Sequence, residues 1–374
     1  MLKINNKYQC SGCAACADVC PAHCIEYRHD AAGFIYPSID AAACIGCGAC
    51  ERVCPIIPGN AATREAGNCF AAWANDQHTH RKSSSGGLGY VLAKSVIGRG
   101  GVVYGCSAAD PTHIRHIRVE DIESLAELQG SKYVQSDTRG VYRLIKEDIK
   151  RGREVLFIGT PCQVSAVRNI YRKYPENLYT ADLICHGVPS QKMLNEQFRS
   201  ISRQMPESVS FRDGNEYRLK LTYPDRKAFS GSVWSVPYFR VFYKGFSFRP
   251  SCYRCPYAGD KRAGDITIGD FWGIKEPENL PEQARDGISA VLVSTPKGQR
   301  LLEAITPELE IHSRPVQEAV SGNDQLRHPV KETYKAKLFR ILYPGLPLRA
   351  AVAACILDSK AVTLARMIKR KFIG

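Results

Sequence analysis

The sequence predicts an α+β protein of several domains: a small cysteine-rich domain at the N-terminus, a larger α/β core, and a helical C-terminal tail. Three observations support this arrangement. Two runs of four cysteines lie within residues 10–55, two strand–turn–helix patterns follow one another in residues 153–171 and 178–198, and apolar, helix-prone segments fill residues 334–374. The chain has 374 residues, of which 44% are hydrophobic and 24% charged, so it can form two or three globular domains.

The two N-terminal cysteine runs read CSGCAACADVCP from residue 10 and CIGCGACERVCP from residue 44. In both runs, two, two and three residues separate consecutive cysteines, and a proline follows the last one. This spacing brings the first three thiolates to one face of a tight turn, while the fourth, which opens a short helix, points away. Zinc sites favour paired Cys-x2-Cys knuckles and disulfides are rare in the cytoplasm, so the pattern indicates two 4Fe-4S clusters.

Both runs resemble those of bacterial dicluster ferredoxins, over residues 1 to about 60. In these ferredoxins the fourth cysteine of each run binds the other cluster. The expected ligands of one cluster are Cys10, Cys13, Cys16 and Cys54, and those of the second are Cys44, Cys47, Cys50 and Cys20. Between the runs, GFIYPSID predicts a short strand and a turn. We therefore expect a ferredoxin domain at residues 1–60.

The two strand–turn–helix patterns predict a parallel pair of strands. We expect the strands at residues 154–158 and before Cys185, and the helices from about Cys162 and from Ser190. The carboxyl ends of parallel strands lie at one edge of a sheet, where open α/β sheets bind ligands, so Cys162 and Cys185 are expected to be neighbours. The helix dipole is expected to favour the thiolate of Cys162.

Further along, SCYRCPYAGD supplies Cys252 and Cys255, and a proline follows the second of them as in the N-terminal runs. With Cys162 and Cys185 they make four thiolates, the number that one more cluster needs. The spacing leaves three alternatives open: a third 4Fe-4S cluster, a structural zinc ion held by the same sulfurs, and buried thiols without a common role.

Six segments between residues 67 and 275 resemble the coenzyme F420 hydrogenase/dehydrogenase beta-subunit family: KSSSGGLGYVL, GGVVYG, LQGSKYVQS, LFIGTPCQVSAVR, LICHGVPS and CYRCPYAGDKRAGDITIGDFWG. This family, which includes hydroxymethyl-chlorophyll reductase, consists of iron–sulfur flavoproteins that bind FAD. The resemblance implies that the four distant cysteines hold a 4Fe-4S cluster beside the flavin. It also predicts an α/β core in two parts, residues 67–150 with a flavin-phosphate loop and residues 151–330 with the third cluster.

The candidate flavin-phosphate loop lies in RKSSSGGLGYVLAKSVI. Ser84 and Ser85 can cap a helix, and Gly86 and Gly87 leave its first turn open, so that free N–H groups and the helix dipole meet the phosphates. The alternative is a flexible Ser/Gly loop that caps an ordinary helix. There is no GxGxxG fingerprint in the chain.

Other candidate cofactor contacts are Lys132 as a second charge, Tyr133 as a ring for stacking, and Thr160 and Gln163 beside the third cluster. The alternative for Lys132 and Tyr133 is a solvated turn. Trp272 and His186 are expected to be structural, and His116 is expected to face water. No catalytic residue is assigned.

Composition and charge argue against nucleic acid as a partner and favour a location in the cytoplasm. The net charge is +14, but anionic clusters would offset part of it, and no nucleic-acid-binding motif accompanies it, so nucleic acid is not an expected partner. No apolar run approaches the ~20 residues that span a bilayer, and the N-terminus lacks the core of a secretory signal. Sixteen cysteines in such a chain indicate metal binding in the cytoplasm.

One-electron clusters and a two-electron flavin together predict an FAD-dependent iron–sulfur oxidoreductase. A reduced ferredoxin or a partner subunit would load the N-terminal clusters, and electrons would pass through the third cluster to FAD and to coenzyme F420 or another small organic acceptor, or in reverse. The alternatives are an electron-transfer or adaptor subunit without a substrate site and a zinc-stabilised binding module. Residues 331–374 predict a basic helical tail that caps the core, or that contacts an anionic membrane or an acidic partner.

Overall fold

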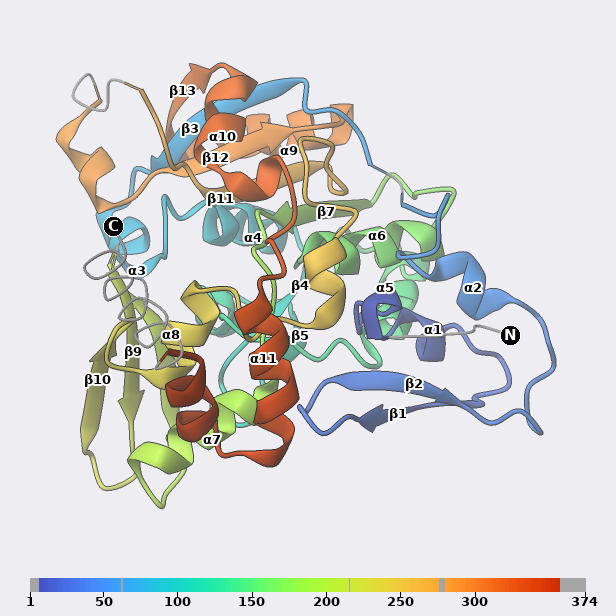
Figure 1. Ribbon diagram of the computed structural model, residues 1–374. Coiled ribbons are helices and arrows are strands. Elements are labelled where there is room, and N and C mark those ends of the chain that lie inside the picture. The colour runs from blue at the N-terminus through green and yellow to red at the C-terminus, as the bar shows by residue number, and fades with distance from the viewer. Residues whose placement is uncertain (1–6, 62, 215, 276–279, 357–374) are drawn as a thin grey trace, which may run out of the picture.

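The centre of the protein is an eight-stranded mixed sheet in the order β13-β3-β12-β11-β7-β6-β4-β5 (Figure 1). The computed structural model describes residues 7–61, 63–214, 216–275 and 280–356. The strands of this sheet are β3 (Asn68–Ala74), β4 (Val102–Ser107), β5 (Arg115–Val119), β6 (Val155–Gly159), β7 (Leu178–Leu183), β11 (Ile266–Asp270), β12 (Ser289–Val293) and β13 (Leu309–Arg314). They come from both segments of the predicted core, residues 67–150 and 151–330, so the two segments build one sheet.

The predicted parallel pair is confirmed by β6 and β7, which pair from Val155↔Leu178 to Gly159↔Asp182. β4 and β11 extend this parallel group on either side, and the four other strands are antiparallel to their neighbours. The carboxyl ends of β6, β7 and β11 therefore share one edge of the sheet, and the chain leaves the first two strands toward Cys162 and Cys185.

Helices cover both faces of the sheet because alternate strand residues point to opposite faces. Val103 and Leu156 pack in the cluster that includes α4 and α9, whereas Tyr104 and Phe157 pack in the cluster that includes α5 and α6. The helices of the core are α3 (Gln77–Lys82), α4 (Leu88–Gly98), α5 (Val141–Lys150), α6 (Pro161–Ile170), α9 (Pro296–Ile305) and α10 (Val316–Gly322).

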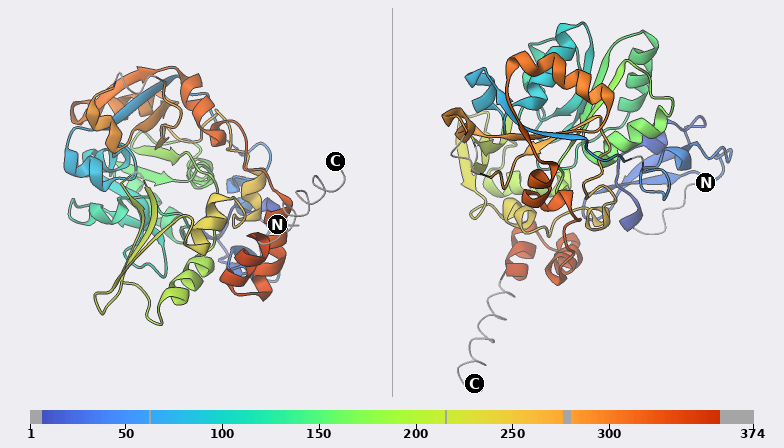
Figure 2. Two further views of the ribbon diagram at one scale, coloured as in Figure 1. Left: turned by 60° about the vertical axis from the view of Figure 1, so that its left-hand side comes forward. Right: turned by 90° about the horizontal axis from the view of Figure 1, so that it is seen from above.

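A second, three-stranded antiparallel sheet lies on the side of the core opposite the N-terminal domain (Figures 1 and 2). Its strands are β8 (Ser208–Asp213), β9 (Glu216–Thr222) and β10 (Ala228–Ser232), and the helices α7 (Gln191–Ile201), α8 (Pro237–Tyr243) and α11 (Tyr334–Leu342) belong to the same hydrophobic cluster. Residues 348–356 are also helical, which confirms a helical C-terminal end. The rest of the predicted tail, residues 357–374, lies outside the described residues. Among the described helices, none has the length and apolar character needed to cross a bilayer.

The N-terminal domain contains one antiparallel strand pair, β1 (Ile25–His29) with β2 (Ile35–Ile39), and two short helices, α1 (Ala15–Asp18) and α2 (Ala49–Val53). The predicted strand between the cysteine runs is thus confirmed. Both helices end before the fourth cysteine of their run, so the expectation that this cysteine opens a helix is wrong. The left-handed residues Ala14 (φ 63°) and Gly48 (φ 68°) begin the helices earlier.

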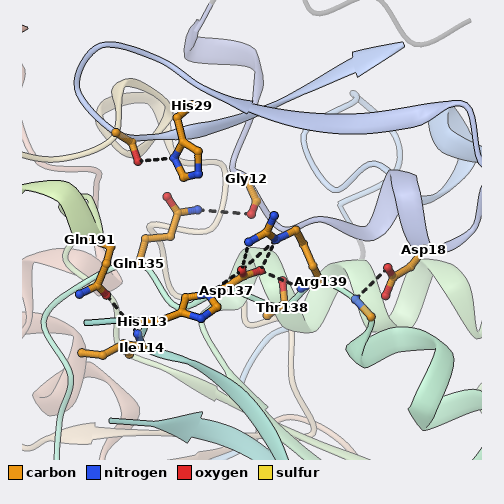
Figure 3. A network of polar contacts seen from close by, with 12 residues as sticks. Gly12, Asp18, His29, His113, Ile114, Gln135, Asp137, Thr138, Arg139 and Gln191 are labelled. Carbon is orange, nitrogen blue, oxygen red and sulfur yellow. Dashed lines mark hydrogen bonds and ion pairs between the residues drawn. The ribbon is translucent and has the colours of Figure 1, made fainter. Parts of the chain in front are cut away.

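Side chains of the core bind the backbone of the first cysteine run. Thr138 Oγ1 and Tyr142 OH both donate to the carbonyl of Cys13, at 2.8 and 2.6 Å. Gln135 Nε2 donates to Gly12 O at 3.3 Å, and Asp18 Oδ1 accepts from the backbone N–H of Gly140 at 3.0 Å (Figure 3). These bonds join the backbone of the first cysteine run and Asp18 to side chains and backbone at the edge of the core.

Candidate functional site

The structure brings together the four cysteines expected on the first cluster. Burial raises the pKa of the Cys16 thiol to about 12, the Tyr27 hydroxyl opposes this, and the nearby Cys10 and Cys54 thiols raise it further. The Tyr27 oxygen lies 3.3 Å from Cys16 Sγ, and the N–H of Gly12 donates to Cys10 Sγ at 3.4 Å. Burial raises the pKa of the Cys13, Cys16 and Cys54 thiols and would keep them protonated unless iron compensates their negative charge, as it does in a cluster.

The four cysteines expected on the second cluster line one small hollow with a fifth, Cys24. Cys24 Sγ is 3.5 Å from Cys20 Sγ. Cys24 has no spacing partner in the sequence, and only the fold places this buried residue beside the second set. Cys47 is exposed, which makes this set the one nearest to solvent.

Cys162, Cys185, Cys252 and Cys255 line a single cavity of about 340 Å³. Burial raises the pKa of the Cys185 thiol to about 12, and the Cys162 and Cys255 thiols add to the effect. Burial also raises the pKa of Cys162, so the expected gain from the helix dipole is outweighed in the chain without metal. The four sulfurs come from the first turn of α6, the segment just after β7, and a 3-10 turn at Pro250–Arg254 with the residue that follows it.

The donor sets suit clusters in number and kind. Among the described residues, no three His, Cys, Asp or Glu side chains converge so closely that they could hold a single metal ion. A structural zinc draws four sulfurs to ~2.3 Å from one point. In a 4Fe-4S cluster each iron takes one cysteine, so either group would be held by four thiolates.

The first cysteine set lies between the other two. Cys50 of the second set is among the groups that raise the pKa of Cys16, and Cys162 of the third set is among those that raise the pKa of Cys13. Ser11, in the first run, also lines the cavity of the third set. The three sets are therefore contiguous, from the exposed second set inward to the cavity.

Arg249 is fully buried beside the first and third sets. Its Nε, Nη1 and Nη2 donate to Cys10 O at 2.6 Å, Gln135 Oε1 at 3.0 Å and Ile35 O at 2.7 Å. Its charge counteracts the rise in the pKa of Cys162. Within the part of the chain that the structure describes, no carboxylate pairs with this guanidinium, and a buried unpaired charge is strongly destabilising. An anionic group next to Cys10 and Cys162 would supply the missing charge.

The candidate phosphate loop forms another wall of the same cavity, through Ser84, Ser85 and Gly87. Gly87 has φ +85° and precedes α4, and no side chain caps the helix. The serine hydroxyls bond to other segments of the core. Ser84 Oγ accepts from Ser131 N at 2.7 Å, and Ser85 Oγ donates to Ile288 O at 2.8 Å. The expectation that serines cap the helix is thus wrong. In the first turn of α4, Tyr90 N donates to Gly87 O at 3.1 Å, so the N–H groups of Leu88 and Gly89 are the ones that a ligand could accept from.

Gly86 does not line the cavity but lets the loop approach the sheet. A Cβ at this position would lie 2.2 Å from Ala72 O and 2.9 Å from Ser289 N. Its own N–H donates to Ser289 Oγ at 2.9 Å. The residue therefore positions the loop and is not itself placed to contact a cofactor.

Lys132 and Tyr133 also line the cavity. The Lys132 ammonium donates to the carbonyls of Glu127, Leu128 and Gln129, at 3.2, 2.9 and 2.8 Å, so its three donors are already engaged. Burial lowers the pKa of this ammonium to about 8. The Tyr133 ring packs against Phe242, with centroids 4.9 Å apart. Both residues are ordered parts of the wall, not a solvated turn.

Thr160 and Gln163 line the cavity and fix the start of α6. Gln163 Oε1 accepts from Thr160 N at 2.9 Å, and Gln163 Nε2 donates to Ser136 Oγ at 3.2 Å. Ser136 Oγ lies 2.7 Å from His116 Nδ1. His116 is buried against Phe157, and burial lowers its pKa to about 4, so the expectation that it faces water is wrong.

Comparison with known proteins gives two matching families. Residues 152–319 match the family that describes the C terminus of the coenzyme F420 hydrogenase/dehydrogenase beta subunit. This part of the chain is similar to that family. Residues 9–56 match the 4Fe-4S dicluster domain, so the N-terminal domain binds two 4Fe-4S clusters. The chain is an iron–sulfur electron-transfer protein related to these beta subunits.

The chain is also similar to one from the xenon-derivatized F420-reducing NiFe hydrogenase complex of Methanosarcina barkeri. The sequences are 20% identical, the TM-score is 0.49, and the alignment covers 71% of this chain and 87% of that chain. No curated protein matches the chain.

Two cavity residues in the segment that matches the beta-subunit family had been expected to be structural. Trp272 is 38% exposed, and its ring lies 5.1 Å from that of His186. Both line the cavity that the four cysteines and the phosphate loop also line. Their place at the carboxyl edge of β7 and β11 makes them candidates for contact with a bound molecule.

Proposed function

We propose that this protein is an FAD-dependent iron–sulfur oxidoreductase. Electrons would pass from the two ferredoxin-type clusters through a third 4Fe-4S cluster to FAD, and from there to coenzyme F420 or another small organic acceptor, or in the reverse direction. The first coordination set lies between the exposed second set and the cavity, which supports this order.

The observation that carries the proposal is the shared cavity. Four cysteines from distant segments line it together with the loop before α4 and the segment around Lys132. A volume of about 340 Å³ lies at the lower end of the range for small-molecule sites. A cluster on the cysteines and a flavin against the loop would thus lie in one enclosure, which is the requirement for electron transfer between them.

The residues of the chain would divide the work of binding. The uncapped first turn of α4 would donate N–H groups to the pyrophosphate of FAD, and Ser84 and Ser85 would hold the loop in place. Arg249 would compensate the negative charge of the thiolate-bound clusters beside it. When bound, the clusters supply one-electron transfer and the flavin supplies two-electron transfer to an organic molecule.

A cysteine substitution tests the third cluster. We expect purified Cys162→Ala to lose about four irons and the reduction of its flavin by dithionite-reduced ferredoxin, while the two N-terminal clusters keep their EPR signals. Cys69→Ala is the matched control, because Cys69 is buried but lies in β3 outside the cavity wall. Equal iron contents in the two variants would rule out the third cluster. Wild-type protein that contains no flavin, together with Cys162→Ala whose iron content is unchanged, would favour the alternative of an electron-transfer or adaptor subunit.

A further inference from the structure

A groove of about 750 Å³ lies where the N-terminal domain meets the core. Residues of α2, α5 and the end of α6 form its walls, and Figure 1 shows these helices beside one another. The groove shares Cys20 and Ala49 with the hollow lined by the second cysteine set. Its floor is therefore also a wall of the site for the outermost cluster.

The rim of the groove is strongly basic. Five exposed side chains on it are Arg52, Arg143, Lys146, Arg172 and Lys173. For the described residues, Lys146 and Lys173 have no carboxylate within ion-pair distance. The one acidic residue in the groove wall is Asp18, whose carboxylate is buried and accepts from the N–H groups of Gly140 and Tyr142 at 3.0 and 3.1 Å. The wall thus presents an excess of positive charge to the solvent.

Two of these cations are tied to the backbone near the cluster site. Arg52 Nη1 donates to Cys47 O at 2.8 Å, and Arg172 Nη2 donates to Arg52 O at 3.0 Å. The positive rim is therefore fixed to the loop that carries the second cysteine set. Clustered charge of one sign in a concave surface raises the encounter rate with an oppositely charged partner.

We propose that this basic groove is the docking site of an acidic one-electron carrier protein, which exchanges electrons with the second cluster. When the protein is being reduced, one electron passes from the reduced carrier to the second cluster. The carrier is oxidised by one electron and the net charge of the cluster falls by one. No covalent bond is made or broken and no proton is transferred. The proposal rests on the electron flow proposed above, but it requires neither the third cluster nor FAD.

The first test is a binding measurement with oxidised flavodoxin, a small acidic FMN protein, so that no electron transfer takes place. Isothermal titration calorimetry with the cluster-loaded protein gives Kd at low and at high ionic strength. We expect the double variant Lys146→Glu/Lys173→Glu to raise Kd at least about tenfold at low ionic strength, and high salt to weaken the wild-type complex.

The matched control is Arg203→Glu/Lys244→Glu, which changes the net charge by the same amount. Both residues are exposed and follow α7 and α8, away from the groove. We expect a change in Kd of less than about twofold. Equal weakening in both double variants would show that net charge and not the groove attracts flavodoxin, and would overturn the proposal, as would an unchanged Kd in the groove variant.

A second test follows electron transfer itself by stopped-flow absorbance. One-electron oxidation of reduced flavodoxin is observed in the red, apart from the bleaching of the clusters. The groove variant is expected to lose at least about tenfold in second-order rate constant with flavodoxin and to react normally with reduced methyl viologen, which needs no docking. If the wild-type protein shows no reduction of a third cluster or a flavin, but the groove variant still reacts more slowly than wild type with flavodoxin, the proposed function is wrong and the docking site is supported. An equal rate constant with flavodoxin in wild type and groove variant contradicts the docking site.

Discussion

Arg249 links the charge of the protein to its cysteine sets. It is fully buried, donates to three acceptors, and lies with its guanidinium carbon 4.3 Å from the centre of the Tyr36 ring. Gly12 leaves the space it needs, because a Cβ there would lie 2.6 Å from Arg249 Nη1. We infer that the negative charge of the clusters compensates the positive charge of Arg249, and that Arg249 raises the reduction potential of the clusters beside it.

Substituting Arg249 tests this inference. We expect Arg249→Met to lower the potential of the clusters beside it by on the order of 100 mV, as for a unit charge several ångströms away at an effective dielectric constant near 20. Arg249→Lys, which keeps the charge but loses the fork of donors, should retain most of the potential and lose stability. Redox titration monitored by EPR measures the potentials. Equal potentials in wild type and Arg249→Met would exclude the tuning role.

Single residues could be predicted where spacing gave them partners. The eight cysteines of the two runs share one spacing, and Cys252 and Cys255 repeat its first step. Cys24 and Arg249 have no such periodic partner, because tertiary contacts alone bring them to the sites. Gln163 and Lys132 were found as cavity residues, but the bonds that engage them depend on packing that no local pattern encodes.

At the scale of elements, the β6–α6 and β7–α7 units were predicted almost completely. An apolar run, a Gly or Pro turn and a helical pattern specify each unit locally, and the parallel pairing follows from the connection between them. The three-stranded sheet β8–β10 was not predicted, although Tyr217, Leu219 and Leu221 alternate with charged residues along β9. The serine loop precedes a helix, α4, as expected, but its hydroxyls bond to Ser131 and Ile288, which lie far away in sequence.

The close approach of this loop to the sheet can be tested at Gly86. We expect Gly86→Ala to destabilise the protein by about 1–3 kcal/mol and to weaken FAD binding, because its Cβ would collide with Ala72 O and shift the loop. Gly98→Ala, at the end of the same helix and with nothing within 4 Å of the new Cβ, serves as control. Chemical denaturation and FAD fluorescence titration measure the two effects. Normal FAD affinity in Gly86→Ala would separate the loop from the flavin site.

At the scale of the whole molecule, contacts between the N-terminal domain and the core bring the three cysteine sets next to one another. Core side chains hold the carbonyls of the first cysteine run, and Ser11 of that run reaches the cavity wall of the third set. The sequence suggested the three sets but not their order in space, because that order depends on how the two domains dock. The contacts place the second set at the surface and the third set at the cavity, with the first set between them.

The presence of a third cluster beside a flavin is tested most directly by counting iron, sulfide, zinc and FAD in protein purified without oxygen. We expect about twelve irons and about twelve sulfides per chain, which correspond to three 4Fe-4S clusters, together with about one FAD and no stoichiometric zinc. About eight irons with a zinc ion and no flavin would contradict the proposed path from the clusters to an organic acceptor.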